Sequence, residues 1–375
     1  MITINSYPAA YVLSGNPVLL DLDFAPSGSN YRILIEVYRD GFGKIGEEII
    51  TTYDYQENII FDASEYILAD LEYNRNTNFT LNFTGGRVGF LHATHARKYY
   101  LKYAEIINYE TGDFETGSTI TALLGGMSEY KINKHGTFNN YFKAWQSEQP
   151  FLNRSMHWEK IISKTTPERL FFLNKETRSM QIEYYLKFTD NSSDLILSES
   201  FSSDEGQVTE IDVSYKPDWD DYSLPVKYYL VTLWDASVGD YVSLAKKYIL
   251  DNRHYRNEEY FIYRNGMGGY DTFRFTGRLT HKANFTRSIF QDVNRVTRNY
   301  QNILNDDYII NTGSISKDDV AVIEELFLSC EVFWIKENVA VPVVINSKKK
   351  TPTTNDQRRF NVSIDFTIAK NEQYA

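Results

Sequence analysis

Short runs of aromatic and β-branched residues, separated by polar turn residues, recur along the chain, and this pattern of hydrophobic and polar positions predicts β-strands. The first third contains four such strands, at residues 31–38, 58–61, 98–109 and 114–124. We expect the last two to form a hairpin about the turn sequence Glu110-Thr111-Gly112-Asp113. Asp62 followed by Glu65 has the pattern of a helix N-terminus and predicts a short helix over 64–71.

The middle of the chain repeats this arrangement, with strands predicted at 180–189, 195–201, 209–215, 227–234 and 241–250. Four short motifs occur in the same order in both stretches: Ile35-Glu36 and Ile182-Glu183, Ile60-Phe61-Asp62 and Glu210-Ile211-Asp212, Lys98-Tyr99-Tyr100-Leu101 and Lys227-Tyr228-Tyr229-Leu230, Gly112-Asp113-Phe114 and Gly239-Asp240-Tyr241. This shared order predicts an internal duplication of one β-sandwich module of the immunoglobulin-like or fibronectin-like kind.

The last third combines strands with a helix. Strands are predicted at 260–264, 270–279, 331–335, 339–345 and 361–368, with the glycine-rich turn 265–269 between the first two. Ser316 and Asp319 form a capping-box pattern before an apolar run of helical period at 320–327. Residues 348–356 read as a polar, mobile loop.

The predicted fold class is therefore mainly β, with two immunoglobulin-like or fibronectin-like β-sandwich modules followed by a strand-rich α+β domain. We place the first module at 1–125, an aromatic-rich connecting segment at 126–175, the second module at 176–254 and the C-terminal assembly domain at 255–375. Within the connecting segment, Pro167 suits either a first helical turn or a final strand.

Composition narrows the classes of function. The 375 residues exceed the usual size of one core, and the 29 Tyr and 23 Phe favour both strands and protein interfaces. A net charge of −11 makes general nucleic-acid binding unfavourable, since that affinity depends on Lys and Arg. No apolar run is long enough to span a membrane, and the N-terminus does not resemble a signal peptide.

No motif predicts catalysis, a cofactor or a metal site. His92 and His95 lack further ligands, and the acidic stretches 190–194 and 218–221 do not follow a calcium-loop pattern. The run 265–270 lacks the spacing of a phosphate loop. Cys330, the single cysteine, lies in an apolar run and is interpreted as a buried packing thiol.

One basic cluster, Lys348-Lys349-Lys350 with Arg358 and Arg359, could meet nucleic acid or an acidic partner. In a chain this acidic we favour a solvated loop or a protein contact.

The run Phe261-Ile-Tyr-Arg-Asn-Gly-Met-Gly-Gly-Tyr-Asp-Thr-Phe-Arg-Phe-Thr-Gly277 resembles tail and virion proteins of phages and prophages of Bacteroidetes bacteria. Other parts of the same pattern are Leu123-Leu-Gly-Gly126, Pro150-Phe-Leu152, Thr312-Gly-Ser-Ile-Ser-Lys317, Leu328-Ser-Cys-Glu-Val-Phe-Trp334, Val341-Pro-Val-Val-Ile345 and Phe360-Asn-Val-Ser-Ile-Asp-Phe366. The resemblance covers most of the chain and implies a structural tail component.

By analogy, a β-rich tail protein of this size resembles a distal-tail or baseplate ring subunit. We therefore expect a non-enzymatic virion protein, made in the bacterial cytoplasm, that binds copies of itself and other tail proteins. The alternative is a tail-associated receptor- or carbohydrate-binding module, in which Trp145, Trp158 and Trp219 stack on sugars. A third possibility is a polysaccharide-degrading enzyme, because paired carboxylates leave no sequence signature.

Overall fold

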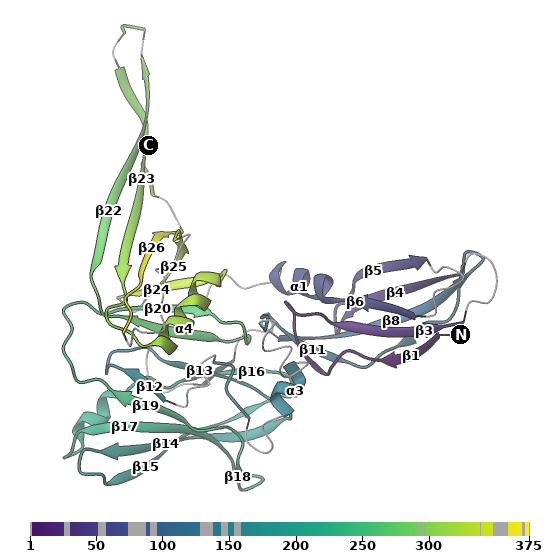
Figure 1. Ribbon diagram of the computed structural model, residues 1–375, viewed down its shortest axis with the longest axis horizontal. Coiled ribbons are helices and arrows are strands. Elements are labelled where there is room, and N and C mark those ends of the chain that lie inside the picture. The colour runs from purple at the N-terminus through teal and green to yellow at the C-terminus, as the bar shows by residue number, and fades with distance from the viewer. Residues whose placement is uncertain are drawn as a thin grey trace.

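The molecule has three parts and a projecting arm. A computed structural model describes residues 2–25, 31–51, 58–73, 88–90, 96–127, 138–143, 149–153, 159–291, 293–295, 297–337, 339–347, 359–369 and 372–374. The chain is mainly β, as predicted, with two β-sandwich modules and a strand-rich C-terminal domain. In Figure 1 the first module extends to one side, the second lies beneath the C-terminal domain, and a long hairpin rises from that domain.

The first module is a sandwich of two sheets. Its smaller sheet has the order β1-β3-β6, with β1 Ile2–Ser6, β3 Leu19–Phe24 and β6 Asn58–Asp62. Its larger sheet has the order β2-β11-β8-β4-β5, with β2 Tyr11–Leu13, β11 Ile120–Leu123, β8 Ala96–Ile107, β4 Arg32–Arg39 and β5 Gly43–Thr51. The inward side chains alternate along each strand, for example Leu20 and Leu22 on β3 against Ile33 and Ile35 on β4.

One helix and one corrected turn complete this module. The predicted helix is confirmed as α1, Ser64–Tyr73, which buries Ile67 and Leu71. The predicted hairpin turn at 110–113 is wrong by two residues, because the chain reverses at Asn108 and Tyr109, both at positive φ. Residues 110–111 already pair back on β8 as β9, Glu110–Thr111, and the returning strand is broken into β10, Glu115–Thr116, and β11.

The second module has the same topology. Its larger sheet has the order β12-β19-β17-β14-β15, with β12 Glu159–Ile162, β19 Lys246–Leu250, β17 Val226–Asp235, β14 Arg178–Phe188 and β15 Ser193–Ser203, and the short β18 Asp240–Tyr241 joins β17. In its smaller sheet, β13 Arg169–Leu173 pairs with β16 Val208–Asp212. As β2 runs parallel to β11 in the first module, β12 runs parallel to β19 here.

The separate connecting segment predicted at 126–175 is therefore corrected. Both β12 and β13 lie within those residues, and they supply one strand to each sheet of the second sandwich. Pro167 precedes strand β13 rather than a helix. The segment is rich in apolar residues because it carries core strands, so the second module begins near residue 159 rather than 176.

The repeated motifs occupy corresponding strands but differ in how well their residues superpose. Ile35 and Ile182 both point into their cores, and Asp62 and Asp212 each accept a hydrogen bond from the backbone N–H of the serine two residues on. The identical Lys-Tyr-Tyr-Leu strings are out of step by one residue. Tyr99 and Leu101 face the first core, whereas Tyr229 and Val231 face the second.

The fourth motif corresponds less well. Gly239 lies at the β17–β18 turn, but Gly112 lies beyond its own turn.

The C-terminal domain is an antiparallel sheet packed on a helix. The sheet order is β21-β20-β24-β25-β26-β23-β22, with β27 also paired to β23. The strands are β20 Glu259–Arg264, β21 Tyr270–Phe275, β22 Leu279–Gln291, β23 Thr297–Asn311, β24 Val332–Lys336, β25 Val339–Ile345, β26 Ser363–Ile368 and β27 Glu372–Tyr374. The predicted helix is confirmed as α4, Lys317–Leu328, with the expected reciprocal capping box between Ser316 and Asp319. The loop predicted at 348–356 lies outside the described residues.

A shared hydrophobic cluster joins the three parts. It takes Leu13 and Leu123 from the first module, Phe171 and Leu173 from the second, and residues such as Tyr270 from the C-terminal domain. In addition, β7, Val88–Phe90, comes from the first module's part of the chain and pairs with β16 of the second. Because interiors of this kind are close-packed, the relative positions of the three parts are fixed.

Candidate functional site

The glycine-rich turn 265–269 is a joint between domains rather than a phosphate loop. Asn265 Oδ1 accepts hydrogen bonds from the backbone N–H groups of Met267 and Gly269, so these donors are already occupied. The carbonyl of Gly266 accepts a hydrogen bond from Gly126 N at 2.9 Å. Gly268 has a φ of +88° and packs against Leu123, so the turn anchors the first module to the C-terminal domain.

Cys330 is exposed, which corrects its interpretation as a buried thiol. It lies in the link between α4 and β24, because the strand begins at Val332, one residue later than predicted. Its Sγ contacts Arg264, which also forms an ion pair with Glu72 at 3.1 Å. These residues line a pocket of about 570 Å³ between the first module and the C-terminal domain.

The other predicted candidates are structural or lie outside the described residues. Trp219 is 1% exposed, and it packs edge-on against Tyr184, Tyr215 and Tyr229 in the second core, so it cannot stack on a sugar. The acidic stretch 218–221 forms part of a 3₁₀ helix, Pro217–Asp221. Over the described ranges, no group of three or more His, Cys, Asp or Glu side chains could hold a metal ion. The candidates outside those ranges are His92, His95, Trp145, Trp158, Lys348–Lys350 and Arg358.

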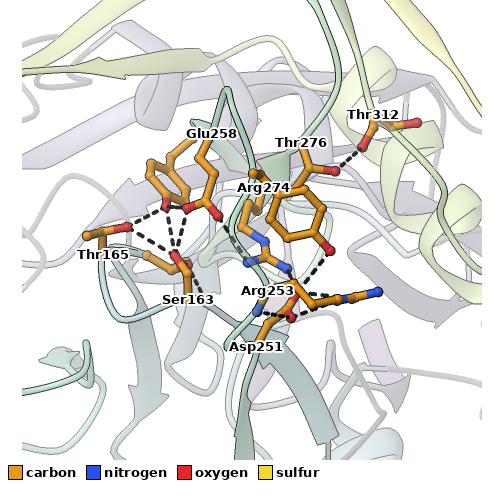
Figure 2. Close-up of polar contacts among 11 residues, drawn as sticks. Ser163, Thr165, Asp251, Arg253, Glu258, Arg274, Thr276 and Thr312 are labelled. Atoms are coloured by element: carbon orange, nitrogen blue, oxygen red, sulfur yellow. Dashed lines mark hydrogen bonds and ion pairs between the residues drawn. The ribbon is translucent and has the colours of Figure 1, made fainter.

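A network of charged residues fixes the second module to the C-terminal domain (Figure 2). Asp251, just after β19, accepts hydrogen bonds from Arg253 at 2.8 and 3.0 Å and from Arg274 on β21 at 2.7 Å. Burial alone would raise the pKa of Asp251, but the hydrogen bonds from both arginines hold it well below its usual range. A carboxylate bound by two guanidinium groups is a structural joint, not a general base.

Hydroxyl groups continue this junction. The Tyr260 hydroxyl donates to Glu258 Oε2 at 2.6 Å, and the Ser163 hydroxyl lies 3.0 Å from the same oxygen and 2.8 Å from Tyr260 Oη, so its one proton can be donated to either. Figure 2 shows Ser163 and Glu258 converging with Thr165 beside Arg274. The described side chains that hydrogen-bond Ser163 are Thr165, Thr166, Glu258 and Tyr260. The adjacent pocket, of about 510 Å³, lies between the two domains.

Buried charges are concentrated at the same junction. Glu168 forms an ion pair with Lys160 at 2.5 Å, and burial raises the pKa of Glu168 although Lys160 opposes the shift. Lys246, on β19, is 6% exposed, and burial together with the nearby Lys160 lowers its pKa to about 8. Strongly perturbed pKa values mark functional sites in some proteins, but ion-pair networks in a domain junction produce them equally.

The hairpin β22–β23 is the most conspicuous feature that the sequence reasoning missed. Its 13- and 15-residue strands pair antiparallel from Leu279 and Ile310 at the base to Gln291 and Thr297 near the tip. The base is anchored where Tyr308 packs against Trp334 and Phe366, and just above it Asn302–Leu304 of β23 pair with the short strand β27. Beyond it the hairpin rises free of the body (Figure 1). We call residues 285–304 the arm.

The arm exposes large apolar side chains. Phe285 is 64% exposed, Ile289 61% and Val293 98%, and Phe290 is also exposed. The signal available in the sequence was the apolar and β-branched content of 285–304, but the polar residues scattered through it obscured strict alternation.

None of the described helices is long and apolar enough to cross a membrane.

Comparison with known proteins adds no functional assignment. No protein-family model matches the chain, and no curated protein matches it. Among solved structures, the FN1–FN3 domains of chicken CNTN1 align with 66% of this chain and 68% of that one, at 10% sequence identity and a TM-score of 0.16. A superposition at that score carries no argument, and the description of the fold rests on the sheet topology alone.

Proposed function

We propose that this protein is a non-enzymatic structural component of a phage tail, a distal-tail or baseplate ring subunit that acts by self-assembly and by contacts with other tail proteins. The observation that carries the proposal is the arm, residues 285–304, which extends from the body with its apolar side chains exposed. The assignment of the protein to a phage tail is supported by the resemblance of residues 261–277 and of the later C-terminal motifs to tail proteins.

An arm of this kind needs a partner surface. An isolated two-stranded hairpin is marginally stable in water, and exposed apolar patches and unpaired strand edges favour association. Strand β22 is the last strand of its sheet, so the outer side of the hairpin presents unpaired backbone groups. A neighbouring protein that covered the arm would bury Phe285, Ile289 and Val293 together.

The rigidity of the body suits a ring. A closed ring requires that each subunit hold its two contact surfaces at a constant angle. The shared cluster around Phe171 and Tyr270 and the network around Asp251 fix the three parts relative to one another. The arm and the first module are then held at a set angle on opposite sides of the molecule (Figure 1).

The test compares the full chain with a variant that has a shortened arm. Asn284 and Asn305 face each other directly in the hairpin, so replacing 285–304 by an Asn-Gly dipeptide should close a tight turn and leave the core residue Tyr308 in place. We expect light scattering to give a discrete oligomer for the full chain and a monomer for the variant, with similar thermal unfolding.

Imaging complements this measurement. Immunogold labelling of assembled virions should place the protein at the tail. A full chain that stays monomeric at every concentration and is absent from virions would overturn the proposal.

A further inference from the structure

A second surface, on the first module, carries the negative charge that the arm lacks. The outer side of the sheet β1-β3-β6 carries Asp21 and Asp23 from β3 and Asp62 from β6, and these three strands contain no Lys or Arg. Their 16 residues (5 from β1, 6 from β3 and 5 from β6) have a net charge of −3. We call this outer side the acidic face.

The acidic face is also apolar at its centre. On β3, Leu20, Leu22 and Phe24 point into the core, so the residues between them point outward. Ile60 on β6 points outward with 61% of its surface exposed, directly opposite Asp21, and Leu19 is 42% exposed opposite Asp62. Ile60 and Leu19 therefore place exposed apolar side chains among the three carboxylates of this face.

Within the part of the chain that the structure describes, the carboxylates of this face accept hydrogen bonds from neutral groups only. Asp21 and Asp23 accept hydrogen bonds from the Asn58 amide, and Asp62 accepts from the backbone of Val18 and Ser64. Within the described ranges, no Lys or Arg forms an ion pair with any of the three. Negative charge is therefore available to a partner.

The arm has the complementary charge. Its residues include Arg287, Arg295 and Arg298 but only one acid, Asp292, which gives a net charge of +2 in a chain whose total is −11. The remainder of the chain is thus at −13. The described arginines Arg287 and Arg295 are exposed, and no carboxylate of the described residues pairs with them. Because the arm is basic and the rest of the chain is acidic, the arm is complementary in charge to another copy of the chain.

The arm does not reach the acidic face of its own molecule. The hairpin rises from the C-terminal domain, whereas β1, β3 and β6 lie in the first module, which extends in a different direction (Figure 1). Because the shared cluster around Phe171 fixes this arrangement, contact between the two surfaces requires a second copy.

We propose that the arm of one copy docks on the acidic face of the next, with Phe285, Ile289 and Val293 covering Ile60 and Leu19 and the arginines meeting the three aspartates. The contact is heterologous, so each copy gives an arm and receives one, and its repetition closes a ring or extends a filament. This inference rests on the proposed function, since it names the partner surface of the same arm.

The experiment is a charge exchange followed by light scattering. The double substitution Arg287→Glu with Arg295→Glu reverses the sign of the charge on the arm. The double substitution Asp21→Lys with Asp23→Lys reverses the sign of the charge on the acidic face. Each double variant alone should lose self-association, with the dissociation constant raised on the order of 100-fold, because like charges then meet at the contact. An equimolar mixture should recover the oligomer, since every arm then meets a face of opposite charge.

The matched control is Glu47→Lys with Glu48→Lys on β5. It makes the same change of charge in the same module, on the edge strand of the other sheet, and should leave assembly intact. Thermal unfolding of all variants verifies that they fold. Raising the salt concentration should weaken wild-type association, because screening reduces attraction between exposed charges.

The outcomes separate the two proposals. A monomeric wild-type chain would contradict the proposed function itself. If the wild type assembles and arm reversal dissociates it, while face reversal has no effect or the mixture fails to recover the oligomer, the arm docks elsewhere and only this inference is overturned. If the β5 control loses assembly while the acidic-face variant still assembles, the arm contacts the β5 edge. That result would also overturn the proposal that the arm docks on the acidic face.

Discussion

The two sandwich modules share a topology and differ in what surrounds them. The first contacts the rest of the molecule at one end and leaves the outer side of β1-β3-β6 exposed. The second is joined on several sides, by β7 at its smaller sheet and by the charged network at β19. Its buried polar residues are correspondingly numerous, and include Glu168, Arg169 and Lys246. The same sandwich topology therefore leaves one sheet face exposed in the first module, whereas in the second module it is packed against the rest of the molecule.

The largest effect is expected in the core of the second module. Trp219→Ala should lower the free energy of unfolding by about 3–5 kcal/mol, because it removes a fully buried indole that touches three tyrosine rings. Chemical denaturation measures the loss. Val238→Ala, at a 68% exposed position in the same module, is the control and should be nearly neutral. A small loss for Trp219→Ala would show that this module is not built around the tryptophan.

A smaller loss is expected at the junction that distinguishes the second module. Asp251→Asn should cost about 2–3 kcal/mol, since Arg274 is 11% exposed and would lose its charged partner. Hydrogen exchange should show faster opening of β21 and β12 in this variant. Asp204→Asn, at an exposed position, is the control and should leave the exchange rates of both strands unchanged.

The pH dependence follows from the same residue. The pKa of Asp251 is lowered on folding, so its contribution is present above the unfolded carboxyl pKa of about 4 and is lost as pH falls below it. If the wild type and Asp251→Asn differ equally at pH 7 and in strong acid, the ion pair is not what holds the junction.

The buried lysine gives a pH effect of the same direction as Asp251, but at alkaline pH. The pKa of Lys246 is about 8 in the folded chain, below the value of about 10.4 for an unfolded lysine. Between these values the unfolded chain binds more protons, so stability should rise by about 1–2 kcal/mol from pH 8 towards pH 10. Urea denaturation across this range measures the rise, and Lys246→Met should abolish it. A flat wild-type profile would argue against a lowered pKa for Lys246 in the folded chain.

The smallest effect on the free energy of unfolding is expected on the exposed outer sheet of the first module. Ile60→Ser should change the free energy of unfolding by no more than about 0.5 kcal/mol, because the side chain is 61% exposed. Self-association should nevertheless weaken. Ile49→Ser on β5, the same residue type at 51% exposure, serves as the matched control. Equal effects of the two substitutions on association would remove the distinction between the acidic face and the rest of the module.

Local patterns determined most of the strands and both long helices. Runs of aromatic and β-branched residues located β14, β17, β20 and β25 to within a few residues, and the capping pattern at Ser316 and Asp319 located the start of α4. Such features depend on contacts between residues close in sequence, which is why a single sequence displays them.

Only the tertiary structure decided how these elements are used. The sequence alone places residues 126–175 in a connecting segment because nothing local shows that β12 pairs with β19, whose paired residues lie 88 positions later. Cys330 was interpreted as buried because its apolar neighbours belong to β24, whereas the cysteine itself lies just before the strand. In both cases burial depends on partners distant in the sequence.

The arm shows the same division most clearly. The sequence by itself determined the composition of 285–304, apolar and basic in an acidic chain. That these residues form a hairpin standing free of the body was decided by pairing between β22 and β23 and by anchoring at Tyr308. Exposure is a property of the whole fold, because a side chain is exposed only where no other part of the chain covers it.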